Sequence, residues 1–147
     1  MQVDVKIDST VDEMKILVIA DKEGHTVDTF VDYIRDYERK QVTKLMAYKG
    51  AYLINISDIL RIYAGNQKVF VETQQNEYIV RYRLYELEEL LEKKTFLRIS
   101  NSEIVNTNQI LNIDLSIVGR ICIRFPGNIQ TYVSRRYVPK IKKSLGI

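Results

Sequence analysis

The first forty residues change from a strand-like to a helix-like pattern of apolar and polar positions. Apolar and charged side chains alternate over residues 2–7, which is typical of a β-strand with one buried face. The apolar run 15–20 predicts a second strand, and Thr26 is a candidate N-cap for a helix that ends near Arg39. We therefore expect residues 1–42 to form a small strand–strand–helix segment. The apolar face of the predicted helix comprises Val27, Phe30, Val31, Ile34 and Tyr37.

From residue 43 onward, the pattern is mostly that of strands at roughly 8–12-residue spacing. The leucines of segment 84–92, with glutamates on the opposite side, predict one short amphipathic helix. Segment 135–145 is basic and can be helical, with Pro139 near its start. The order of elements is not an alternation of strands and helices, which argues against Rossmann and TIM-barrel architectures. The expected strands are residues 44–48, 52–56, 68–73, 77–82, 95–99, 103–106, 110–115, 120–125 and 130–133.

The formal net charge of the 147 residues is only +3, but it is unevenly distributed. Residues 1–40 carry six basic and ten acidic side chains, and residues 41–106 carry nine and eight. Residues 107–147 carry seven basic side chains and one acidic side chain. Such a concentration of positive charge is expected at a phosphate-binding face, although a solvated face without a partner has the same composition.

Several classes of protein are disfavoured by what the sequence contains. Cys122 is the single cysteine and His25 the single histidine, so an intramolecular disulfide, multi-thiolate zinc sites and two-imidazole chemistry are excluded. The longest apolar run, 16–20, is far shorter than the roughly 20 residues that span a bilayer. No nucleotide-binding, zinc-protease or nucleophile-elbow motif is present. We expect a cytoplasmic, non-enzymatic protein that is not embedded in a membrane and needs neither cofactor nor metal.

Two segments carry a specific resemblance. Residues 96–106 read FLRISNSEIVN, and residues 132–145 read YVSRRYVPKIKKSL. Together with LYELEELL at 84–91, they resemble the LytTR family of bacterial DNA-binding domains over roughly residues 43–147. The lead of residues 1–42 is similar to that of stand-alone members, which lack a receiver domain.

The resemblance implies a transcription regulator with a mostly β, elongated fold of small stacked sheets and one short helix. It also implies recognition of duplex DNA by loops that enter successive major grooves. Many members have histidine where this chain has Ser100, so any contact at that position is altered. The positions that match the family's contact loops and basic end are Asn66, Gln67, Lys68, Ser100, Asn101, Ser102, Ser134, Arg135, Arg136, Lys140, Lys142 and Lys143.

The chemistry of these residue types suits DNA. Arg136 can bond a guanine edge bidentately and Asn101 an adenine edge, whereas serine and lysine suit phosphate oxygens. Alternatives remain open: Asn101 can form an Asx-turn, Arg136 a surface ion pair, and Arg98 either a structural or a DNA contact. Tyr137 and Phe96 are expected to be core anchors.

Duplex DNA, with paired direct-repeat sites, is the expected partner. A homodimer, or control by a membrane protein encoded nearby, would give residues 1–42 an interaction role. A protein–protein module is one alternative function. Single-stranded nucleic-acid binding is another, because the chain contains ten tyrosines and a basic, β-rich part.

Overall fold

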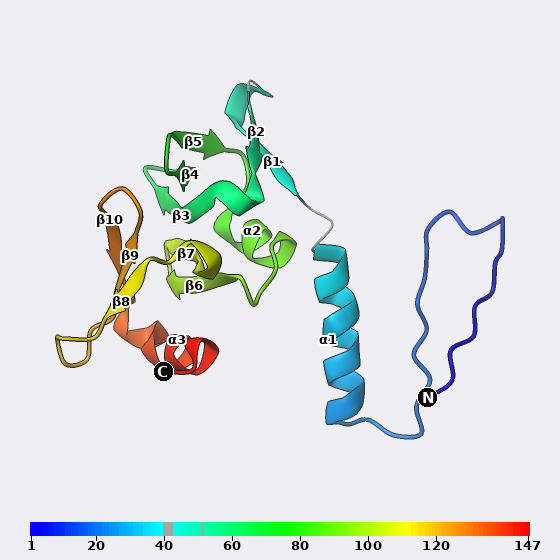
Figure 1. Cartoon of the computed structure of the whole chain (residues 1–147). Helices are drawn as coiled ribbons and strands as arrows, with labels where there is room; N and C mark the ends of the chain where they lie inside the picture. Colours follow the sequence, from blue (N-terminus) through cyan, green and yellow to red (C-terminus); the bar gives the residue numbers. More distant parts are fainter. Residues whose placement is uncertain (40–42, 51) are drawn as a thin grey trace. The chain divides into compact units, whose positions relative to one another are not determined.

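The structure is a computed structural model that describes residues 1–39, 43–50 and 52–147 (Figure 1). The chain divides into two units, Met1–Tyr33 and Ile34–Ile147. The sequence-based boundary at residues 41–43 falls partly outside the described residues, because Gln41 and Val42 are not among them. The division of the chain into segments 1–42 and 43–147 therefore stays a prediction.

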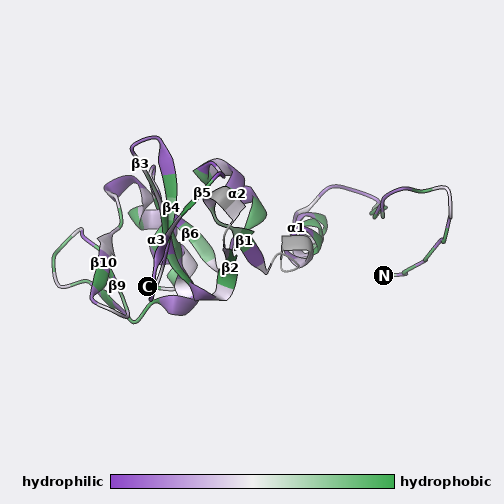
Figure 2. Cartoon of the chain, turned by 90° about the horizontal axis from the view of Figure 1, so that it is seen from above, coloured by the Kyte–Doolittle hydropathy of each residue, from purple (hydrophilic) through white to green (hydrophobic). Residues whose placement is uncertain are grey.

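Helix α1 (His25–Arg39) confirms the helix expected from the apolar spacing of this segment. It begins slightly earlier than predicted, because the backbone N–H of Asp28 donates to the carbonyl of Gly24 at 3.1 Å. Gly24 therefore stands at the start of the helix, and Thr26 lies inside its first turn. Hydrophobic and hydrophilic residues both occur along α1, as the colours of Figure 2 show.

Residues 1–24 contain no strand, so the prediction of strands at 2–7 and 15–20 is wrong. Their apolar side chains are exposed, including Val5 at 79% and Leu17 at 83%. Alternation predicts a face that is suited to burial, but a strand also needs a hydrogen-bonded neighbour and a covering layer. Neither is present for these two segments among the described residues.

The second unit is mostly β, as predicted, and its strands form three small antiparallel sheets among the described residues. Their orders are β1-β2, β5-β4-β3-β7-β6 and β10-β9-β8. The predicted strand 110–115 shortens to β8 because residues 107–109 form a 3-10 turn just before it. The strands are β1 (Lys44–Met46), β2 (Leu53–Asn55), β3 (Ile59–Gly65), β4 (Lys68–Thr73), β5 (Glu77–Val80), β6 (Phe96–Ser100), β7 (Glu103–Asn106), β8 (Asn112–Asp114), β9 (Cys122–Phe125) and β10 (Ile129–Tyr132).

The five-stranded sheet separates two hydrophobic cores. The first core joins one face of this sheet to β1, β2 and helix α2 (Leu84–Leu90), with Ile62 and Ile104 fully buried in it. The second joins the other face to the three-stranded sheet and helix α3 (Val138–Leu145), with Leu60 and Val105 fully buried. In β7, the neighbours Ile104 and Val105 enter different cores, as the period of two requires. In β3, the register shift between Ile59 and Arg61 breaks this period, so Leu60 and Ile62 also lie on different faces. Phe96 lies in the first core, as expected.

Each helix of this unit is fixed by one buried stripe. In α2, Leu84 and Leu87 are buried, and the carboxylate of Glu86 accepts the backbone N–H of Arg83 at 3.0 Å. In α3, Ile141 is buried in the second core. Gly146 ends α3 with a φ of +70°, a left-handed conformation that glycine adopts without steric cost. The helical alternative for segment 135–145 is therefore confirmed.

Candidate nucleic-acid interface

The first predicted contact loop is the tight turn between β3 and β4. Gly65 and Lys68 are paired across the hairpin, and Asn66 and Gln67 form the two-residue connection. Their φ angles are +51° and +62°, the left-handed pair that a type I′ hairpin turn requires. Asparagine tolerates this conformation, but Gln67 occupies a position where glycine is favoured. Both side chains, and that of Lys68, are exposed at the end of the sheet.

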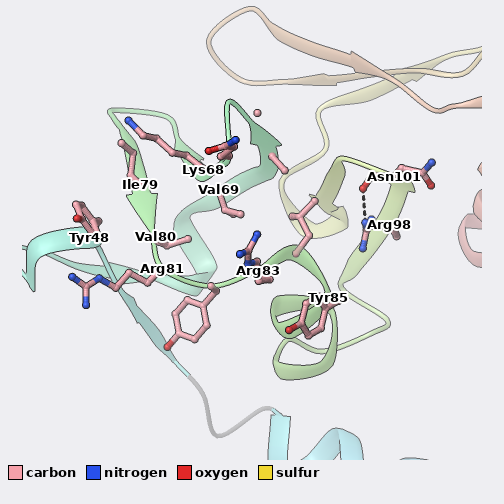
Figure 3. Close-up of a pocket in the computed structure, with 15 residues that line it drawn as sticks. Tyr48, Lys68, Val69, Ile79, Val80, Arg81, Arg83, Tyr85, Arg98 and Asn101 are labelled. Atoms are coloured by element: carbon pink, nitrogen blue, oxygen red, sulfur yellow. Dashed lines mark hydrogen bonds between the residues drawn. The ribbon is translucent and has the colours of Figure 1, made fainter.

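The second predicted loop, Ser100–Ser102, is the turn between β6 and β7, and Arg98 holds it in place. The Arg98 guanidinium donates to the carbonyl of Ser100 at 2.7 Å and to that of Asn101 (Figure 3). It also forms an ion pair with Glu88 of α2 at 2.5 Å. Arg98 is only 16% exposed, so the structural alternative for this residue applies. Glu88 lies on the solvent-facing side of α2 and, through this ion pair, also has a structural role.

The serines of this turn are bonded to one another. The backbone N–H of Ser102 donates to the hydroxyl of Ser100 at 3.2 Å, and the two hydroxyl oxygens are 3.3 Å apart. Ser102 is exposed, and Ser100 is half-buried. The turn is therefore compact even though its side chains are small and polar.

The third predicted loop begins at Ser134 and continues as the 3-10 helix Arg135–Tyr137. The backbone N–H of Ser134 donates to the carbonyl of Ile99 at 2.9 Å, which attaches this segment to β6. The hydroxyl of Tyr137 donates to the side-chain oxygen of Asn101 at 3.2 Å. Asn101 therefore uses its side chain across two loops. The Tyr137 ring packs against the second core, as expected of an anchor.

The three loops meet at one end of the five-stranded sheet. The backbone N–H of Ala64, just before the first turn, donates to the carbonyl of Ser102 at 2.8 Å. Together with the bonds from Ser134 and Tyr137, this contact places the Asn101 turn between the other two. The residues of these loops are more than thirty positions apart in sequence, yet direct hydrogen bonds connect them in space.

The basic residues fall into two groups by partner. Structural arginines are paired with carboxylates: Arg61 with Glu72 at 2.5 Å and Glu103 at 3.2 Å, and Arg124 with Asp114 at 3.1 Å. The predicted contact residues have no ion-pair partner in the described part of the chain, so the ion-pair alternative for Arg136 is not supported. This second group comprises Lys68, Arg135, Arg136, Lys140, Lys142 and Lys143.

Partly buried hydrogen bonds of Glu103 connect strands beneath the loops. Glu103 accepts from Arg61 and also accepts the Thr131 hydroxyl at 2.7 Å, which connects β7 to β10. Burial, the hydrogen bond from its own hydroxyl to Glu77, and the negative charges of Glu77 and Glu72 raise the pKa of Tyr63 to about 12. Tyr63 and Arg61 are neighbours, with the guanidinium 5.0 Å from the ring centre.

The lysines of α3 form the outer part of the candidate interface. Lys140, Lys142 and Lys143 are exposed, whereas Ile141 between them is the buried residue of α3. In the described part of the chain, no side-chain hydrogen bond or ion pair joins them to the loops, but α3 follows the 3-10 helix of Arg135 without interruption. The arrangement suits long-range attraction of phosphates better than recognition of a single base.

A groove of about 970 Å³ begins at two of the loops, and sequence reasoning missed it (Figure 3). It shares Gln67, Lys68 and Asn101 with the loops and continues past Arg81 and Arg83 towards α2. The only sequence signal was the triplet Arg81-Tyr82-Arg83, which lies just before the quoted segment 84–91 and in none of the three quoted segments. None of the described residues that line the groove is an aspartate or a glutamate.

In the ranges that the structure describes, no group of three histidine, cysteine, aspartate or glutamate side chains is arranged to hold a metal ion. Cys122 is buried at 6% exposure in β9. No helix among the described residues is long and apolar enough to cross a membrane.

Comparison with known proteins assigns a family. The LytTr DNA-binding domain matches residues 49–146. A protein described as an uncharacterized HTH-type transcriptional regulator of Staphylococcus aureus (strain NCTC 8325) is 31% identical over 147 residues, covering 100% of this chain and 99% of the relative. Its counterpart in strain COL matches to the same extent. A solved LytTr DNA-binding domain from Bacillus cereus has a TM-score of 0.65 at 27% identity, covering 71% of this chain and 95% of that one.

The names of the relatives refer to a helix-turn-helix, which differs from the fold of this chain. In the residues that the structure describes, α1 and α2 are each followed by a strand, and α3 is the last element. A LytTr-type domain is indicated instead by the small antiparallel sheets, the three loops and the family match over two thirds of the sequence. The chain belongs to the LytTR family of DNA-binding transcriptional regulators.

Proposed function

We propose that the protein binds duplex DNA in a sequence-specific manner and reads the major groove with its three loops. The observation that carries the proposal is the hydrogen-bonded juxtaposition of the Asn66, Asn101 and Arg136 loops at one sheet end, with unpaired cations around them. Functional side chains gather on loops that a rigid sheet positions. Because the relatives are bacterial transcriptional regulators, the proposal places the protein with chromosomal DNA in the cytoplasm.

We assign each loop residue to a base edge or to a phosphate oxygen according to the chemistry of its side chain. Arg136 and Asn101 are assigned to base edges, Arg136 for guanine and Asn101 for adenine. Asn66 and Gln67 are assigned to a neighbouring groove position. The remaining residues are assigned to phosphate oxygens, which fix register and affinity without sequence information; they are Lys68, Ser100, Ser102, Ser134, Arg135, Lys140, Lys142 and Lys143.

Selection from a pool of randomised duplexes tests the proposal, followed by mobility shifts on the enriched sequence. Arg136→Ala is expected to cost about 1–3 kcal/mol on that sequence and to relax the preference at one base pair. Lys142→Ala is expected to weaken binding to all duplexes alike. Lys94→Gln is the matched control, because this exposed lysine lies at the other end of β6 from the Asn101 turn.

Failure of the folded protein to enrich any duplex at low salt would overturn sequence-specific binding. Competition between a duplex and a single strand at fixed salt tests the alternative of single-strand binding, which predicts a preference for the single strand. If the enriched sequence contains two direct repeats, two protomers bind each site, as expected from paired sites.

An interaction role for residues 1–42 is the second candidate function. Its supporting observation is an accumulation of exposed apolar side chains, including Ile7 at 89% and Ile19 at 86%, together with the apolar stripe of α1. Contiguous exposed apolar surface marks protein interaction sites. The partner is a second copy of the chain or a regulatory membrane protein encoded nearby.

Sedimentation of the full chain and of a 43–147 fragment tests this second candidate. A homodimer formed by residues 1–42 predicts a concentration-dependent mass increase for the full chain and not for the fragment. Equal monomeric behaviour of both would contradict dimerisation through this segment.

A further inference from the structure

The groove next to the loops holds positive charge that the three loops do not explain. Arg98 is neutralised by Glu88, but Arg81 and Arg83, which belong to none of the loops, have no ion-pair partner among the described residues. The same holds for Lys68 of the first loop, which also lines the groove. Among the lining residues that the structure describes, none carries a carboxylate that would compensate them. Uncompensated charge in a concave surface concentrates counter-ions and so attracts anionic ligands.

The two arginines are held at fixed places on the groove. The Arg81 guanidinium lies 4.9 Å from the centre of the Tyr48 ring, a cation–π contact that leaves its N–H groups available. Arg83 has an extended backbone, and its backbone N–H donates to the carboxylate of Glu86 at the start of α2. Both side chains are exposed, whereas Tyr82 between them packs against the first core. Arg81 and Arg83 both line the groove.

The groove is continuous with the loops that are assigned to DNA. Gln67, Lys68 and Asn101 belong to both surfaces, and in Figure 3 Arg81, Arg83 and Arg98 follow one another across the view. Duplex DNA carries one negative charge per roughly 1.7 Å of its axis, so a duplex that touches the loops extends phosphates beyond them. An open, basic groove that begins at a base-reading loop suits a strand of that backbone.

We propose that Arg81 and Arg83, together with Lys68, bind the phosphate backbone of duplex DNA next to the three loops. The DNA interface then includes the connection between β5 and α2, which the resemblance to the family does not assign. This inference rests on the proposed function, because it needs a duplex seated on the loops.

The salt dependence of binding tests the proposal without knowledge of the target sequence. The probe is a mixed-sequence duplex of about 30 base pairs, three helical turns. Arg81→Gln and Arg83→Gln are compared with wild type and with Lys94→Gln over a range of salt concentrations. Each phosphate contact contributes about 0.9 to the log–log slope, or roughly a threefold loss of affinity between 50 and 200 mM salt.

We expect each groove variant to flatten the slope by about 0.9, while Lys94→Gln keeps the wild-type slope. Arg81→Lys and Arg83→Lys preserve the charge and are expected to restore the slope, which also covers the case that a glutamine variant folds poorly. Wild-type slopes in both glutamine variants would overturn the groove assignment and leave the proposed function intact. Absence of duplex binding by the wild type would overturn both, and an effect on single-stranded DNA alone would overturn the duplex assignment.

Discussion

The hydroxyl of Tyr137 donates a hydrogen bond to the side-chain oxygen of Asn101 at 3.2 Å. The two residues come from loops that are far apart in sequence, and the bond fixes which end of the Asn101 amide faces Tyr137. An adenine edge needs both a donor and an acceptor from one asparagine, so the orientation of the amide matters. Tyr137 thereby acts as a positioning residue for Asn101.

Tyr137→Phe is expected to weaken specific DNA binding by about 0.5–1.5 kcal/mol, the usual net value of one hydrogen bond. The ring stays in the second core, so the melting temperature should change little. Mobility shifts on the selected duplex measure the loss. In an Asn101→Ala background, the same substitution should have no further effect on affinity, and an undiminished loss there would contradict the positioning role.

Arg98→Lys is expected to lower the stability of the β-rich part by about 1–2 kcal/mol. Lysine cannot bond Glu88 and the two turn carbonyls at once, and the partial exposure of Glu88 limits the contribution of the ion pair itself. Thermal unfolding followed by circular dichroism measures the change. Glu88→Gln removes only the ion pair and should be milder, so an equal or larger loss in that variant would contradict a role through the carbonyls.

Gln67→Gly is expected to stabilise the protein and to weaken DNA binding. The left-handed conformation of Gln67 carries a steric cost of roughly 1 kcal/mol that glycine avoids. The substitution also deletes a side chain that we assign to the DNA. A raised melting temperature combined with a higher Kd is the expected result, and a lowered melting temperature would contradict the strain argument. Asn66→Gly is the matched comparison, because asparagine adopts this conformation more easily.

Alkaline pH is expected to destabilise the protein through Tyr63. Its pKa is raised from 10 to about 12, so the folded state keeps a proton that the unfolded state releases. The stabilising contribution is complete below pH 10 and disappears as the pH rises towards 12. Tyr63→Phe should show a shallower decline of stability over this interval, and the phenolate absorbance that develops as the pH rises towards 12 should be smaller in this variant than in the wild type.

Local pattern was sufficient for elements whose partner is close in sequence. The hairpins around residues 65–67 and 101–102, the leucine stripe of α2 and the apolar face of α1 were all readable, because each depends on side-chain period and turn residues. The same rule failed for residues 2–7 and 15–20. Alternation predicts which face of a segment is apolar, but it does not predict whether another element packs on that face.

Side-chain roles that depend on contacts with residues distant in sequence could not be predicted from the sequence. Arg98 and Arg136 are both arginines of the matching segments, yet only the position of Glu88 on α2 decides that Arg98 is structural. Asn106, the last residue of the first segment, is 2% exposed and donates to the carbonyl of Ile59 at 2.8 Å. The pairing of β4 with β5 brings Arg81, Arg83 and Lys68 to the lining of one groove.

The middle position of the Asn101 turn has a consequence for how DNA preference can diverge. This turn is bonded on one side to Ala64 and on the other to the segment of Ser134 and Tyr137. A replacement that alters the turn therefore disturbs two neighbours, and its effect depends on their sequence. Under the proposed mode of binding, relatives should acquire new target preferences first at Gln67 and Arg136, whose side chains can change without altering the shared support.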